Sequence, residues 1–160
     1  MQTEKIALES AKNAFNTIKV LKGQYANIAT CDEAGNPNVA PIGSMRIVDD
    51  ETVHVLQGFL PRTMQNLRRN PKATFSVNLR PRVMDFLSVL RNKEDESMGY
   101  QVTCELMATD ASTEAVVEEY RHIARRTPWL LRGAFMRFCE KNLKQLLKFK
   151  ITEVRSIGKP

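Results

Sequence analysis

A segment near the start of the chain carries apolar side chains at the spacing of an α-helix. Within residues 4–22 the apolar positions recur three or four residues apart, and the positions between them are mostly polar or charged. This period predicts an amphipathic helix with one face against a core, and Gly23 would end it. The apolar positions are Ala7, Ala11, Ala14, Phe15, Ile18 and Leu21.

Six later segments have the pattern of β-strands. In the clearest of them, residues 72–79, apolar and polar residues alternate, which is the period of a strand with one buried face. The turns at residues 32–36 and 49–51 are short, so the segments that they join are expected to form antiparallel hairpins. The predicted strands are residues 25–31, 38–48, 52–58, 72–79, 100–108 and 149–157.

Further helices are predicted between and after these strands. A short helix covers residues 63–69, with Thr63 as its N-cap and Asn70-Pro71 as its end, and another covers residues 83–90. Two more begin at Ser112 or Thr113 and at about residue 134, the second running to residue 147. The pattern predicts a mainly β, α+β fold: a six-stranded antiparallel barrel with an N-terminal helix and inserted C-terminal helices. We expect one domain over residues 1–160, with the helical insertion at about 112–147.

Charge is concentrated in one part of the chain. The whole sequence has 24 basic and 18 acidic residues, a net charge of +6. Residues 121–150 alone contain nine basic residues and one acid, Glu140, so this basic segment is at +8 and the rest of the chain at −2. A local excess of this size raises the question of an anionic partner.

The numbers and spacing of cysteines and histidines limit which metal sites the chain can form and indicate its redox compartment. Cys31, Cys104 and Cys139 form no C-x-x-C pair, and with only His54 and His122 the chain has no plausible zinc quartet. Free thiols suit a reducing cytoplasm, and no apolar stretch approaches the length of a membrane span. We therefore expect a cytoplasmic protein without a metal site or a membrane partner.

No common catalytic signature is present, and the candidate chemistry lies in residues 57–71, Q-G-F-L-P-R-T-M-Q-N-L-R-R-N-P. Gly58 ends a strand, where a missing side chain lets a ligand approach the backbone. Arg62 and Thr63 stand at the predicted helix start with Asn66 one turn further on, and free helix N–H groups together with a guanidinium suit a phosphate. The residues alone leave open that Thr63 only caps a connector helix and that Arg62 is solvated. His54, inside a predicted strand, is interpreted as structural.

The run from A-N-I-A-T-C-D-E-A-G-N-P through V-A-P-I-G-S-M-R to R-T-M-Q-N-L-R-R-N-P resembles the FMN-binding split barrels related to pyridoxamine 5′-phosphate oxidase. The resemblance covers residues 25–79 and extends more loosely to 99–108 and 149–158. Its most specific part is the basic-Thr-x-x-Asn-Leu helix that ends in Asn-Pro after two hairpin strands.

The resemblance implies a cofactor, a binding site and an assembly. In this family the FMN phosphate is held at that helix start, the flavin ring lies along the second strand, and the end of the third strand approaches the ribityl chain. The family forms homodimers with two flavins at the interface, each also touched by the partner subunit. The positions of this chain that match the FMN-binding residues are Pro41, Ile42, Ser44, Arg46, Gln57, Gly58, Arg62, Thr63 and Asn66.

Two departures narrow the implied function. The oxidase itself usually has Arg-Lys at the phosphate, where this chain has Arg62-Thr63. The oxidase also ends in a Trp- and Arg-bearing segment, which this chain does not match, because its tryptophan, Trp129, stands in the insertion. Oxidation of pyridoxamine phosphate is therefore not expected. We expect an FMN-dependent oxidoreductase that transfers a hydride or electrons, with a reduced nicotinamide or another redox protein as donor. No catalytic acid or base is assigned, and the substrate is not specified by the sequence.

Three alternatives remain at this stage. The same fold could hold haem or a deazaflavin, or the protein could store flavin without turnover, for example in a stress response. A nucleic-acid-binding module could use the basic segment, although that segment also has the apolar stripe of a packed helix. The basic stripe of Arg137, Lys141 and Lys144 could instead attract an anionic substrate.

Overall fold

The computed structural model describes residues 2–18, 25–58, 60–78, 99–111, 113–125 and 127–157. Its helices are α1 (Gln2–Asn16), α2 (Pro61–Arg69), α4 (Thr113–Ala124) and α5 (Arg132–Asn142), with a 3₁₀ turn η2 (Trp129–Leu131) before α5. Its strands are β1 (Ala26–Cys31), β2 (Pro37–Ile42), β3 (Met45–Ile47), β4 (Thr52–Gln57), β5 (Lys72–Asn78), β6 (Gly99–Asp110) and β7 (Gln145–Ile157).

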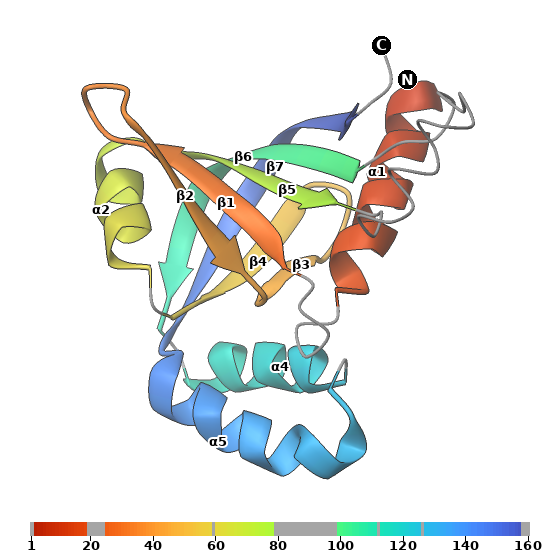
Figure 1. Ribbon diagram of the computed structural model, residues 1–160, viewed down its shortest axis with the longest axis vertical. Coiled ribbons are helices and arrows are strands. Elements are labelled where there is room, and N and C mark those ends of the chain that lie inside the picture. The colour runs from red at the N-terminus through yellow and green to blue at the C-terminus, as the bar shows by residue number, and fades with distance from the viewer. Residues whose placement is uncertain are drawn as a thin grey trace, which may run out of the picture.

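The strands form one antiparallel sheet that curls around a core (Figure 1). Their order is β2-β1-β5-β6-β7-β4-β3, so β2 and β3, which follow each other in the chain, lie at opposite edges. This is the predicted antiparallel split barrel, which is confirmed, with seven strands in place of six. The predicted strand 38–48 divides at Gly43-Ser44 because the chain leaves its pairing with β1 there and begins to pair with β4.

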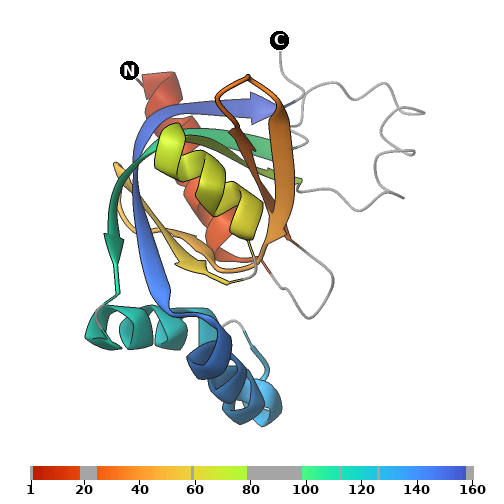
Figure 2. The same ribbon diagram turned by 90° about the vertical axis from the view of Figure 1, so that its left-hand side faces the viewer.

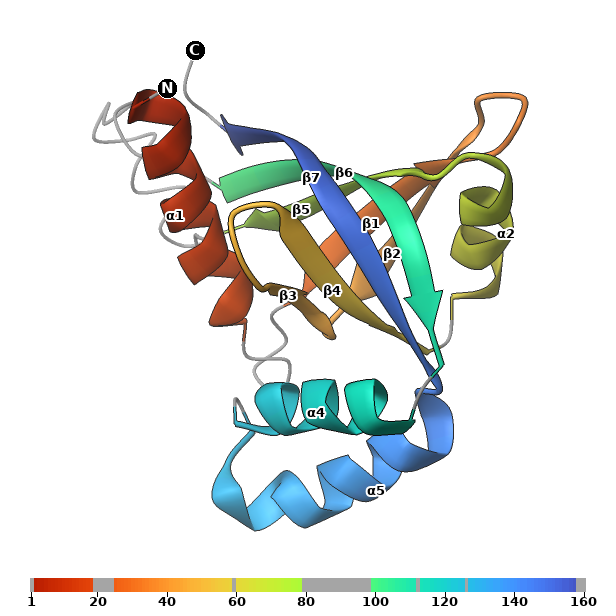
Figure 3. The ribbon, with the colours of Figure 1, turned by 180° about the vertical axis from the view of Figure 1, so that it is seen from behind.

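Three helical elements cover different parts of the curled sheet. The helices α1 and α2 lie on opposite sides of it, and α2 packs beside β1 and β2 (Figure 2). The pair α4 and α5 lies together beyond the ends of β4 and β7, with α5 farther from the sheet than α4 (Figure 3). The inserted helices are thus held as a separate layer next to one end of the barrel.

Two apolar clusters hold these layers. The larger one fills the curled sheet and includes Phe15 of α1, Phe75 and Phe149, and the last two rings meet edge to face with centroids 5.3 Å apart. The smaller one joins the outer face of β4 and β7 to α4 and α5. Its buried members are Leu56, Val116, Tyr120, Ile123, Cys139, Leu143 and Leu146.

The ends of two helices differ from the sequence prediction. α1 ends at Asn16 and not at residue 22, and α5 ends at Asn142 and not at residue 147. Beyond α5, Leu146 and Leu147 are on β7, where neighbouring side chains face opposite sides: Leu146 joins the helical cluster and Leu147 the barrel core. The helix predicted at residues 83–90 lies outside the described residues.

The start of α2 also corrects the prediction. The helix begins at Pro61, two residues earlier than expected, with Leu60 at the cap position, so Thr63 is not the N-cap. Proline suits the first helical position because it needs no N–H partner there. Within the described part of the chain, no helix combines the length and the apolar character that crossing a bilayer requires.

Candidate functional site

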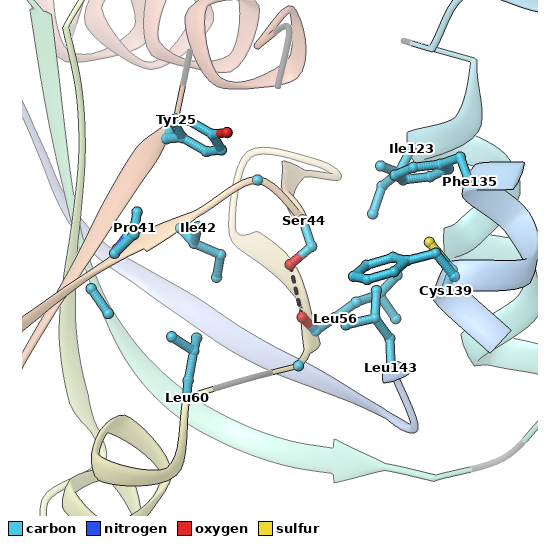
Figure 4. Close-up of a pocket in the computed structure, with 14 residues that line it drawn as sticks. Tyr25, Pro41, Ile42, Ser44, Leu56, Leu60, Ile123, Phe135, Cys139 and Leu143 are labelled. Carbon is cyan, nitrogen blue, oxygen red and sulfur yellow. Dashed lines mark hydrogen bonds between the residues drawn. The ribbon is translucent and has the colours of Figure 1, made fainter. Parts of the chain in front are cut away.

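A pocket of about 460 Å³ lies between the barrel and the helical pair (Figure 4). One wall comes from the corner between β2 and β3 and from the end of β4, and the opposite wall from α4 and α5. The lining residues are Tyr25, Ala40, Pro41, Ile42, Gly43, Ser44, Leu56, Gly58, Leu60, Ile123, Phe135, Phe138, Cys139 and Leu143.

None of the described residues that line the pocket has a charged side chain. Its polar side-chain groups are those of Tyr25, Ser44 and Cys139. The Ser44 hydroxyl donates to the backbone carbonyl of Leu56 at 2.7 Å, and burial raises the pKa of the Cys139 thiol to about 11, so this thiol stays protonated at neutral pH. Tyr25 and Phe138 are about half exposed on opposite walls, while Phe135 lies deeper. Such a pocket suits a flat, uncharged group.

The end of β4 closes the pocket tightly. A Cβ atom on Gly58 would lie 2.6 Å from Cδ2 of Leu143, so glycine allows β4 and the segment after α5 to approach each other. Next to it, the side-chain oxygen of Gln57 is buried and has no hydrogen-bond partner within the described residues. Gln57 shares a face of β4 with the core residues Val53 and Val55, whereas Leu56 on the other face lines the pocket, so this oxygen is not assigned to the pocket.

A second, polar groove runs along α2 and adjoins the pocket, because Leu60 lines the pocket and Pro61 lines the groove. Arg62 is exposed in the first turn of α2, where the backbone N–H groups of a helix have no intrahelical partner. The groove residues are Asp32, Pro61, Arg62, Gln65, Asn66 and Arg69. This geometry can hold an anion at the helix start.

Neighbouring charges make Arg62 the main cation of that groove. Arg69 pairs with Glu33 at 3.4 Å near the other end of α2. Asp32 has its pKa lowered, chiefly by the hydrogen bond from the Asn36 side chain and also by the charge of Arg62. An anion at the groove would therefore meet Arg62 and the first N–H groups of α2.

Two of the predicted phosphate ligands turn inward. Thr63 is buried, and its hydroxyl accepts a hydrogen bond from the Asn38 amide at 3.1 Å. Asn66 is also buried, and its amide donates to the Thr30 hydroxyl at 3.1 Å. These bonds tie α2 to β1 and β2 and fix the helix start from behind.

The Arg46 side chain lies in a different place, on the outer face of β3 beneath α4. Its guanidinium donates two bonds to the carboxylate of Glu119, from Nε at 2.6 Å and from Nη2 at 2.8 Å. His54 Nδ1 lies 3.0 Å from the second carboxylate oxygen. Burial disfavours the charge on Glu119, but the bonds from Arg46 and His54 outweigh it and lower the pKa of this carboxyl to about 2.

The nine predicted cofactor residues therefore fall into groups. Pro41, Ile42, Ser44 and Gly58 line the pocket, and Arg62 and Asn66 line the adjoining groove. Gln57 precedes Gly58 in the chain but does not line the pocket, Thr63 packs behind the helix start, and Arg46 pairs with Glu119 away from both.

The sequence prediction names no site residue on the opposite wall of the pocket. Phe135, Cys139 and Leu143 form the apolar stripe of the helix predicted at residues 134–147, and such a stripe is usually core. Glu119 was missed as well, although it stands among Val116, Tyr120 and Ile123 on the apolar face of α4. An acid within an apolar face is the signal that could have marked it.

Comparison with known proteins places this chain in a family. The family model described as pyridoxamine 5′-phosphate oxidase matches residues 17–158. A search of curated protein sequences finds no match.

Solved structures with the same fold are named for different ligands. An FMN-binding protein from Syntrophomonas wolfei subsp. wolfei superposes with a TM-score of 0.65 at 23% identity, over 96% of this chain and 87% of that chain. HutZ from Vibrio cholerae, a haem-storage protein by name, gives 0.55 at 14% identity, over 93% and 94% of the two chains. A protein named F420 reductase gives 0.53 at 15% identity, over 82% and 89%.

Proposed function

Because the chain belongs to the pyridoxamine 5′-phosphate oxidase family, we propose that it binds FMN in the pocket and the adjoining groove and acts as an oxidoreductase. One observation carries the proposal. An uncharged, aromatic-lined pocket adjoins, through Leu60 and Pro61, a helix start that carries Arg62. FMN has the same sequence of parts: an uncharged flat ring, a hydroxylated chain and a phosphate.

The residues present fit each part of the cofactor. The ring would lie among Pro41, Ile42 and the aromatic side chains of the opposite wall. The ribityl chain would run past Gly58 and Leu60, where the pocket meets the groove, and no contact is assigned to Gln57, which lines neither. Arg62, with the N–H groups of the first turn of α2, would hold the phosphate.

When bound, the flavin supplies hydride or electron transfer, and the protein binds and orients it. Ser44 would hold its side of the pocket rigid, since its hydroxyl is fixed on Leu56. The apolar wall of α4 and α5 would keep water from the ring, which strengthens polar interactions inside the pocket. No catalytic acid or base is assigned, and a reduced nicotinamide or another redox protein would be the electron donor.

The active form would be a homodimer with a flavin at each side of the interface. In a single chain the pocket is open between the half-exposed rings of Tyr25 and Phe138, and a partner subunit would complete its cover. β2 is an edge strand, and Val39 on it is 64% exposed. The three cysteines are free thiols, which suits a reducing cytoplasm. A monomeric mass by light scattering for the FMN-loaded protein would contradict the dimer.

Haem is a weaker candidate for this pocket. The two histidines of the sequence, His54 and His122, do not line the pocket, and His54 is engaged with Glu119. A haem would therefore lack the commonest axial ligand there. A deazaflavin shares the flat ring and would differ from FMN in its absorption spectrum.

The phosphate site provides a direct test. We expect Arg62→Ala to weaken FMN binding by about 1.5–3 kcal/mol, on the order of 10- to 150-fold, because a charge-assisted bond is lost. Arg68→Ala is the matched control, since Arg68 is exposed on the same helix but does not line the groove. Titration of each variant with FMN, followed by flavin fluorescence, measures the difference. Equal affinities of the two variants would contradict the assignment of Arg62.

A further inference from the structure

Three consecutive large apolar side chains stand exposed between α4 and α5. They form η2 and are named here the apolar tip: Trp129, 74% exposed, Leu130, 73% exposed, and Leu131, 49% exposed. Exposed apolar residues are ordinary when they are scattered singly, but a contiguous group marks an interaction surface. The tip adjoins the start of α5, in the layer of the molecule that lies farthest from the sheet (Figures 1 and 3).

Basic side chains surround the apolar tip in sequence. It stands within the basic segment 121–150, which carries +8 while the rest of the chain carries −2. The exposed basic residues on or next to α4 and α5, named here the basic frame, are Arg121, Arg125, Arg132, Arg137, Lys141 and Lys144, whereas Lys148 and Lys150 of the segment lie on β7. An exposed apolar group on a helical layer that carries several exposed cations is complementary to a surface that is anionic outside and apolar beneath.

We propose that the apolar tip and its basic frame dock this protein onto the surface of an anionic lipid bilayer. Tryptophan favours the interface between water and lipid, and leucine side chains gain by entering the acyl boundary. Lysine and arginine close to an anionic leaflet each add about 1 kcal/mol of attraction. The expectation of no membrane partner rested on the missing apolar span, and docking at the surface needs none.

Two other occupants match the surface less well. A second copy placed symmetrically on this face would bring two basic segments together, and like charges repel. A nucleic acid offers phosphates for the cations but no apolar layer for Leu130 and Leu131. Both remain outcomes that the experiment separates from lipid docking. The inference does not depend on FMN binding.

The chain contains its own probe, since Trp129 is its only tryptophan. The full-length protein is mixed with vesicles of phosphatidylcholine alone or of phosphatidylcholine with phosphatidylglycerol, and emission and iodide quenching are recorded. We expect a blue shift and protection from iodide only with the anionic vesicles, reversed by added salt. No change with anionic vesicles, or the same change with phosphatidylcholine alone, would overturn the proposal.

Variants separate the apolar and the electrostatic contributions. The double change Leu130→Ser and Leu131→Ser should abolish binding to the vesicles, whereas Ile6→Ser, which removes a side chain 63% exposed on α1, should not. Lys141→Glu should weaken binding by roughly fivefold or more, from the loss of one attraction of this size. Lys72→Glu, at an exposed position of β5, is its control.

Two further readouts would count against the lipid surface. If Trp129 emission is already blue-shifted and protected without vesicles, and this protection falls on dilution, a second copy covers the tip. If an RNA or DNA oligonucleotide protects Trp129 while anionic vesicles do not, the partner is a nucleic acid. Either result overturns the proposal.

Discussion

Glu119 is a buried acid that pairs with two basic side chains of the barrel. Glu119 is 2% exposed on α4, and its carboxylate accepts two hydrogen bonds from Arg46 on β3 and one contact from His54 on β4. A buried ion pair adds little net stability when complete, but removal of one partner leaves a buried charge unpaired. Glu119 therefore links α4, which forms part of the pocket wall, to β3 and β4 of the barrel.

Glu119→Gln should lower the free energy of unfolding by about 3 kcal/mol, because Arg46 loses the negative charge that compensates its burial. The control is Glu118→Gln, since the side chain of Glu118 is 72% exposed and its pairing with His122 one helical turn on is long, at 3.9 Å. This control should change the unfolding free energy by less than about 0.5 kcal/mol. Urea unfolding at neutral pH measures both, and equal stabilities would show that the cluster does not anchor α4.

The same cluster predicts how stability depends on pH. The pKa of Glu119 is lowered from 4.5 to about 2 on folding, so its stabilisation is complete above pH 4.5 and is lost as the pH falls towards 2. The gap in unfolding free energy between the native chain and Glu119→Gln should shrink over this interval. Urea midpoints of both proteins at pH 7 and pH 3 test this, and a constant gap would contradict the assigned pKa.

A substitution of Gly58 is expected to affect FMN binding more than the stability of the fold. Alanine there would press on Cδ2 of Leu143, the flexible end of a side chain that also lines the pocket, so Leu143 would shift and reshape the pocket. We expect Gly58→Ala to weaken FMN binding at least tenfold while the unfolding free energy falls by no more than about 2 kcal/mol. Gly133→Ala is the control, because no atom lies within 4 Å of its added Cβ and alanine favours a helix. Unchanged FMN affinity in Gly58→Ala would exclude the end of β4 from the site.

At the scale of elements, local patterns predicted most of the barrel. The alternation of residues 72–79 and the two short turns predicted the hairpins, and the Arg62-Thr63-x-x-Asn66 helix was placed within two residues. These features depend on neighbours in the sequence, which a pattern can report. The pattern of residues 38–48 predicts one strand, because nothing local shows that its two halves pair with different strands.

The helical wall of the pocket could not be predicted in the same way. Leu143, Leu146 and Leu147 continue the stripe of α5, yet the helix ends before them because Leu146 and Leu147 are needed on two faces of β7. A stretch that is buried on both sides reads equally well as helix or strand. The assembly of Ile123, Phe135 and Leu143 opposite β2 depends on tertiary packing alone.

At the scale of the whole molecule, the net charge of +6 divides between two surfaces. The barrel part is close to neutral, and its proposed anion is a single phosphate at Arg62. The described cations of the helical layer do not line the pocket, and attraction of an anionic substrate by Arg137, Lys141 and Lys144 stays a prediction.

The visible absorption spectrum of the purified protein, before and after mixing with FMN and desalting, tests the central claim most directly. We predict that the protein retains the absorption bands of flavin after desalting and that acid precipitation releases FMN from it. A protein that stays colourless after this treatment, or one that carries the bands of haem, would contradict the account.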